Sequence, residues 1–69
     1  MPLTCAGAGE RHVIRRIGGD DAVRRHLESL GFVVGGTVSV VSTLGPNLIV
    51  NIKDARIAVD GDLAARVLV

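Results

Sequence analysis

The chain has 69 residues, which is enough for one small domain and too few for two. Apolar residues make up 48% of it, and eight basic and seven acidic side chains leave a net charge of +1. This composition allows one compact core, but it lacks the strong basic excess and the aromatic side chains that nucleic-acid-binding proteins normally use, since Phe32 is the only Phe, Tyr or Trp.

The first predicted element is a strand that follows a short apolar lead and a turn. The lead covers residues 2–5, and the turn falls on the AGAGE segment at residues 6–10. Residues 11–17, RHVIRRI, are rich in β-branched side chains, which favour a strand. Gly18 and Gly19 end this strand.

A helix is predicted next, beginning after Asp20. Aspartate is a good N-cap because its carboxylate accepts a hydrogen bond from a free backbone N–H of the first turn. Val23, Leu27 and Leu30 recur at spacings of four and three, which places them on one helical face. Gly31 fits the left-handed position that commonly follows a helix, so the helix is expected to end there.

The charged side chains of this helix are expected to neutralise one another. Asp20 with Arg24 and Asp21 with Arg25 are i,i+4 pairs in the favourable order. The arginines of the first half are therefore interpreted as part of a solvated, self-neutralised face. The two aspartates would also repel a phosphate from the start of the helix, so we do not predict nucleotide binding.

The second half of the chain alternates with a period of two and is predicted to be all strand and turn. Strands are expected at TVSVVST, LIVNI, RIAV and RVLV, with turns at LGPN, KDA and DGD, the last capping a single helical turn through Ala64. The predicted fold is mostly β with one main α-helix. It is a small, partly open SH3-like β-barrel formed by a single domain over residues 1–69.

The sequence contains no recognisable catalytic set, cofactor motif or metal motif. Cys5, Glu10, His12 and His26 are possible metal ligands, but none has the spacing of a known site. We therefore predict no catalytic residue, no cofactor and no assigned metal site. Metal binding by Cys5, His12 or His26 stays open, as does the oligomeric state.

The first ten residues lack the pattern of a secretion signal, and no apolar run approaches the length of a membrane span. Cys5 is the only cysteine, so it has no partner for an internal disulfide. We expect a cytoplasmic protein that does not insert into the membrane.

The junction between the helix and the following strand is the candidate partner surface. Leu30, Phe32, Val33 and Val34 place four large apolar side chains in five positions, and Leu27 lies one turn before them. If the core does not bury all of them, the remainder forms an apolar patch of the kind that contacts partners. The alternative, in which all of them belong to the core, is equally compatible with the sequence.

These residues also carry a resemblance to a known family. The segment RRHLESLGFVVGGTVSVV is similar to the characteristic pattern of the FeoA family, small cytoplasmic proteins of bacterial ferrous-iron uptake. The matching positions are Arg25, Leu27, Leu30, Gly31, Phe32, Gly35, Val38 and Val40. The chain departs from the family pattern where Val34 replaces a common Pro, Asp54 a common turn Gly, and Leu63 a common acid.

The resemblance implies an SH3-like barrel without enzymatic activity. It also implies a partner, the membrane ferrous-iron transporter FeoB, whose cytoplasmic nucleotide-hydrolysing part the protein is expected to bind as a regulator. The alternative is a stand-alone, metal-responsive regulatory module that resembles the SH3-like C-terminal domain of iron-dependent repressors.

Overall fold

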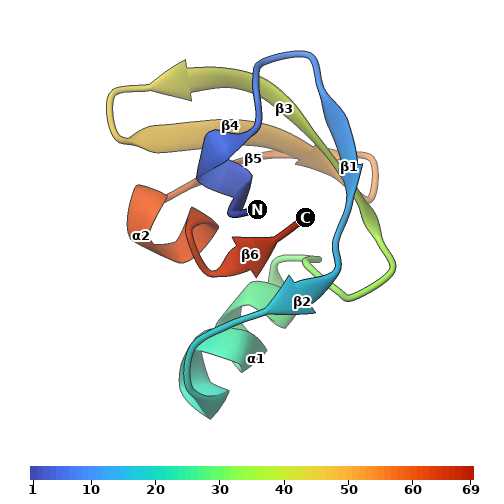
Figure 1. Ribbon diagram of the computed structural model, residues 1–69, viewed down its shortest axis with the longest axis vertical. Coiled ribbons are helices and arrows are strands. Elements are labelled where there is room, and N and C mark those ends of the chain that lie inside the picture. Colours follow the sequence, from blue (N-terminus) through green and yellow to red (C-terminus); the bar gives the residue numbers. More distant parts are fainter.

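The computed structural model describes residues 1–69 and contains two antiparallel sheets and two α-helices (Figure 1). The larger sheet has the strand order β1-β3-β4-β5, and the smaller one pairs β2 with β6. The strands are β1 (Arg11–Val13), β2 (Arg16–Ile17), β3 (Thr37–Leu44), β4 (Asn47–Ile52), β5 (Ala55–Val59) and β6 (Val67–Leu68). The helices are the 3-10 turn η1 (Leu3–Cys5), α1 (Asp21–Ser29) and α2 (Gly61–Ala64).

Helix α1 begins and ends at the predicted residues. The carboxylate of Asp20 accepts a hydrogen bond from the backbone N–H of Val23 at 2.9 Å, which confirms it as the N-cap. At the other end Gly31 has a φ of 109°, which favours glycine. Gly31 N–H donates to the carbonyl of Glu28 at 2.9 Å and Phe32 N–H to that of Leu27 at 3.0 Å. These two bonds form the Schellman motif, which turns Phe32 back towards the core.

The hairpins of the larger sheet follow the predicted alternation. Val38 and Val40 on β3 face the core, and Val40 lies directly opposite Val50 of β4. The remaining core positions of β4 are Leu48 and Ile52, both at most 4% exposed. The period-two pattern therefore predicted correctly which face of this sheet is buried.

The first strand is shorter than predicted, because the expected strand over residues 11–17 is two strands in two different sheets. Between β1 and β2, Ile14 N–H donates to the carbonyl of Gly36 and Arg15 N–H to that of Leu68, both at 2.8 Å. The chain thus leaves the larger sheet at Ile14 and joins the smaller one at Arg15. The last strand, β6, pairs with β2 and takes no place in the larger sheet.

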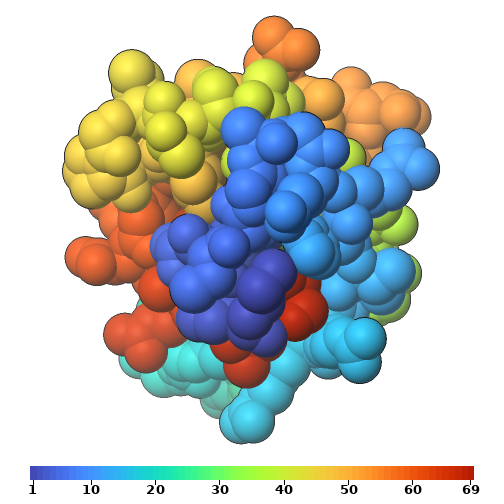
Figure 2. Space-filling model, turned by 45° about the horizontal axis from the view of Figure 1, so that its top comes forward, coloured from blue at the N-terminus to red at the C-terminus, as the bar shows by residue number.

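One hydrophobic core joins both sheets and the helices. Its 15 buried residues come from almost every element, and Phe32 is the largest of them. The sheets are not closed into a continuous barrel, and the fold is the SH3-like fold that the sequence predicted. Figure 2 shows the dark blue N-terminal segment lying against the red C-terminal end. Met1 and Val69 exchange two hydrogen bonds of 2.7 Å there.

The DGD segment forms a helix cap, as predicted, and its glycine has an additional role. The carboxylate of Asp60 accepts a hydrogen bond from Asp62 N–H at 2.7 Å at the start of α2. A Cβ atom on Gly61 would lie 2.3 Å from the carbonyl oxygen of Pro46. Glycine is therefore needed here for space, because α2 packs directly on the turn between β3 and β4.

Candidate partner-binding groove

The structure separates the five residues predicted to contact a partner into core and surface. Leu27 and Phe32 are 0% exposed, so their side chains belong to the core of the folded protein. The Schellman motif is the physical reason, since it folds Phe32 inward. Leu30 and Val33 are half-buried, and Val34 is 64% exposed.

Val33 and Val34 form one wall of a surface groove of about 480 Å³. The groove lies between β2, the loop that precedes α1, α1 itself and the segment that leads into β3. We call it the arginine groove. Its lining residues are Arg15, Arg16, Ile17, Gly18, Gly19, Arg24, Glu28, Val33 and Val34.

The fold fixes each wall of the arginine groove. Arg16 lies on β2, opposite Leu68 of β6. Arg24 and Glu28 are four residues apart on α1 and therefore share one helical face. The valine wall is held by Gly35 N–H, which donates to the carbonyl of Ile14 at 2.8 Å, beside the bond from Ile14 N–H to Gly36.

The charges around the groove are arranged differently from the prediction. Arg24 forms an ion pair with Asp21 at i,i+3, and Arg25 donates to the backbone carbonyl of Asp21 at 3.3 Å. The predicted Asp20–Arg24 and Asp21–Arg25 pairs are absent, because the carboxylate of Asp20 caps the helix and that of Asp21 pairs with Arg24. The side chains of Arg15 and Arg16 form no ion pair or hydrogen bond within the protein.

A second hollow, of about 530 Å³, lies on the outer face of the larger sheet. Six of its seven lining residues are polar or charged, among them Thr37, Ser39 and Asn51. A polar outer face is what an antiparallel sheet normally presents to solvent. The arginine groove differs because the exposed apolar side chain of Val34 lines it together with unpaired arginines, which makes it the stronger candidate for a binding site.

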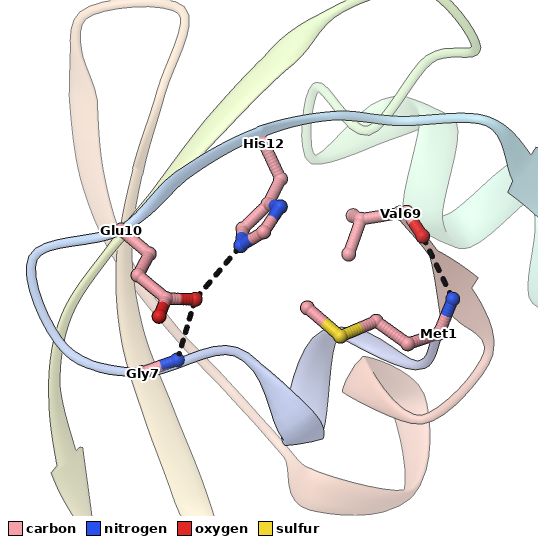
Figure 3. A network of polar contacts seen from close by, with 5 residues as sticks. All are labelled: Met1, Gly7, Glu10, His12 and Val69. Atoms are coloured by element: carbon pink, nitrogen blue, oxygen red, sulfur yellow. Dashed lines mark hydrogen bonds and ion pairs between the residues drawn. The ribbon is translucent and has the colours of Figure 1, made fainter.

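Among the possible metal ligands, only His12 and Glu10 form a polar contact with each other. Cys5 is exposed and His26 is exposed on α1. His12 makes a 2.9 Å contact from Nε2 to Oε1 of Glu10 (Figure 3). No group of three or more His, Cys, Asp or Glu side chains is placed to hold a metal ion. The contact with His12, together with the N–H of Gly7, lowers the pKa of Glu10.

Comparison with known structures finds the same fold in FeoA proteins and in part of a metal-dependent repressor. A crystal structure of the iron uptake regulatory protein FeoA matches with a TM-score of 0.89 and 30% identity, over 96% of this chain and 88% of that chain. A solution structure of FeoA from Chlorobium tepidum matches with a TM-score of 0.86 and 26% identity, over 99% and 67%. Part of a manganese-dependent transcriptional repressor has the same fold, with a TM-score of 0.87 and 18% identity, over 97% of this chain and 39% of that one.

No curated protein sequence gives a significant match to the chain. Neither α-helix has the length and apolar character that crossing a lipid bilayer requires.

The model of the FeoA domain matches residues 1–69, the full length of the sequence. The chain therefore belongs to the FeoA domain family.

Proposed function

We propose that this protein is an accessory protein of bacterial ferrous-iron uptake that works in the cytoplasm without enzymatic activity. It acts by binding the cytoplasmic nucleotide-hydrolysing part of a FeoB-type membrane transporter. The observation that carries this proposal is the match to the FeoA domain over all 69 residues. The 30% identity to an iron uptake regulatory protein supports the same role.

The proposed contact surface is the valine wall of the arginine groove. Val34 is 64% exposed, and Val33, which lines the groove with it, is half-buried. Leu30, the C-cap residue of α1, is also half-buried but does not line the groove. Because the Val34 side chain is already at the surface beside a half-buried Val33, a partner can cover both without any rearrangement of the core. Val34 also occupies the position at which the family pattern commonly has Pro. The groove of this chain therefore presents a valine where other family members commonly have proline.

Substitution of Val34 by Asp tests this surface. The matched control is Leu44→Asp, because Leu44 is 63% exposed and lies at the far end of β3, about 23 Å from the first residue of that strand. We expect Val34→Asp to weaken binding of the purified cytoplasmic part of FeoB from the same genome by at least about fivefold. Leu44→Asp should leave the affinity within about twofold. Calorimetry measures the affinity, and circular dichroism verifies that both variants are folded.

Two outcomes would count against this proposal. If the unmodified protein does not bind FeoB, then FeoB is not its partner. If a folded Val34→Asp variant binds with the same affinity as the unmodified protein, then the valine wall is not the contact surface.

The second candidate function is a stand-alone, metal-responsive regulatory module. The likeness to part of a manganese-dependent repressor motivates it, although at 18% identity this likeness concerns the fold alone. Such a module would bind metal through His12, His26 or Cys5, and these residues are distributed over separate elements. Anaerobic titration with Fe²⁺ tests this function. Binding heat that disappears in His12→Gln or His26→Gln would favour it over the transport role.

A further inference from the structure

We propose that the arginine groove binds an acidic segment of the partner protein that also carries an apolar side chain. The carboxylates of this segment pair with Arg15 and Arg16, and its apolar side chain packs against Val33 and Val34. The inference rests on the proposed function only in requiring a protein partner, and it specifies the chemistry by which that partner is recognised.

The charge distribution supports an acidic occupant. Three of the eight bases of the chain and one of its seven acids line the groove, so the rest of the molecule carries five bases and six acids. The groove is therefore positive on an otherwise slightly negative protein. Within it, Arg15 and Arg16 are the arginines without an internal partner, whereas Arg24 is paired with Asp21.

Arginine suits such a site because its planar guanidinium forms bidentate hydrogen bonds with carboxylates and is weakly hydrated. Arg15 and Arg16 are consecutive in the chain, both are exposed, and both line the groove. Each guanidinium can therefore pair with a carboxylate of its own. An acidic segment with two carboxylates can reach both.

The apolar wall argues for a peptide over a phosphate or a nucleic acid. Val34 is largely exposed beside the arginines, and neither a phosphate nor a sugar–phosphate backbone has a group to cover it. The one aromatic side chain, Phe32, is buried, so no base can stack on it. A volume of about 480 Å³ is in the range of sites that accept a few side chains, which fits a short segment.

Glu28 provides a test with a definite sign, because it is the only acid in the groove. Its side chain makes no hydrogen bond or ion pair within the protein. Removing its charge should therefore strengthen binding of an acidic segment and weaken binding of a basic one. A loss of structure would not produce this increase in affinity.

The probe for the experiment is the synthetic peptide acetyl-Asp-Glu-Leu-Asp-Glu-amide, titrated into the ¹⁵N-labelled protein and followed by NMR. We expect the backbone amides of Arg15, Arg16 and Val34 to shift, and the affinity to fall several-fold between about 50 and about 300 mM NaCl. A second peptide replaces Leu by Ser, and a third replaces all four acids by Lys. Both should bind more weakly than the first.

Three variants assign the effect to the groove. Arg16→Glu should weaken binding of the acidic peptide about fivefold, and Glu28→Gln should strengthen it about twofold. Arg56→Glu is the matched control, because Arg56 is also an exposed strand arginine without a partner and does not line the groove. It changes the net charge as much as Arg16→Glu does, and it should alter the affinity less than about twofold.

The inference is overturned if the Lys peptide binds as well as the acidic one, or if Arg16→Glu and Arg56→Glu have equal effects. It is also overturned if inorganic phosphate alone reproduces the shifts with the same affinity, which would indicate an anion site only. The cytoplasmic part of FeoB is tested in parallel with the same variants. If the acidic peptide binds but FeoB does not, the proposed function is wrong and the proposed specificity of the groove still holds. If FeoB binds with the same affinity to Arg16→Glu and Glu28→Gln as to the unmodified protein, the proposed function holds and this inference is wrong.

Discussion

The carboxylate of Glu10 accepts hydrogen bonds from two groups, and this gives the protein a pH-dependent contribution to stability. The contact with His12, at 2.9 Å, and the N–H of Gly7, at 3.0 Å, hold the pKa of Glu10 below its ordinary value of 4.5. A lowered folded-state pKa means that the contribution is fully present above pH 4.5. It is lost as the pH falls through the folded-state pKa.

We expect His12→Ala to raise the pKa of Glu10 towards 4.5, but not fully to it, because the bond from Gly7 remains. The carboxyl ¹³C shift of Glu10, followed through the acid range, measures this change. His26→Ala is the control, since His26 makes no contact with Glu10. An identical titration in the wild type and His12→Ala would show that the His12 contact does not stabilise the charged carboxylate in solution.

Single residues also show the limit of sequence interpretation. Asp20 and Gly31 were identified correctly because a helix cap depends on neighbours within three or four residues. Gly61 was predicted as part of a turn, but the reason that it must be glycine is the carbonyl of Pro46, 15 positions away in the sequence. Such a requirement follows from a tertiary contact that no local pattern records.

At the scale of elements, the turn between β4 and β5 has an unusual composition. Lys53 and Asp54 have φ values of 48° and 63°, which correspond to the two central positions of a type I′ hairpin turn. Asn-Gly is the favoured pair there, and the family pattern commonly has Gly where this chain has Asp54. The hairpin therefore contains two residues with side chains in a backbone region that favours glycine.

The stability of Asp54 variants should follow how well each new residue tolerates a positive φ. We expect Asp54→Gly to be at least as stable as the wild type. Asp54→Val should be less stable by about 1–2 kcal/mol, because a β-branched side chain is strained in this conformation. Urea unfolding measures the ranking, and Ala55→Val, one residue later on β5, serves as the control for adding valine to an exposed position. Equal stability of Asp54→Val and Asp54→Gly would contradict the turn conformation.

The elements that the sequence predicted incorrectly are those whose limits depend on distant partners. Residues 11–17 have strand character throughout, so no local signal marks the transfer from one sheet to the other. That break depends on hydrogen bonds to Gly36 and Leu68. For the same reason the pairing of β6 with β2 was not predicted, whereas the hairpins of the larger sheet, which join neighbouring strands, were.

At the scale of the whole molecule, the candidate site combines segments that the sequence keeps apart. The valine wall was predicted from its local apolar excess. The arginines were interpreted as self-neutralised, because Asp20 was predicted both to cap the helix and to pair with Arg24. In the structure Asp20 only caps the helix, and Asp21 forms the ion pair with Arg24. Two consecutive arginines in the segment predicted as a strand, with no acid within four residues before them or three after them, were the available signal for Arg15 and Arg16.

Since the groove is built from β2, α1 and the segment before β3, it should exist only when both sheets are folded. A two-stranded pair such as β2–β6 is not stable alone, so its stability comes from the shared core. Val67 on β6 is 0% exposed and lies opposite Ile17 of β2. We expect Val67→Ala to lower the free energy of unfolding by about 2 kcal/mol for the whole protein.

Amide hydrogen exchange distinguishes this global effect from local opening of the small sheet. The N–H groups of Arg15 and Gly18 report on the small sheet, and that of Val40 reports on the large one. In Val67→Ala all three should lose protection by the same factor, about thirtyfold for 2 kcal/mol. Val13→Ala, at a 55% exposed position, is the control and should change protection little. Loss of protection confined to Arg15 and Gly18 would instead show that β2 and β6 open on their own, in which case Arg16 would leave the groove while the larger sheet stays folded.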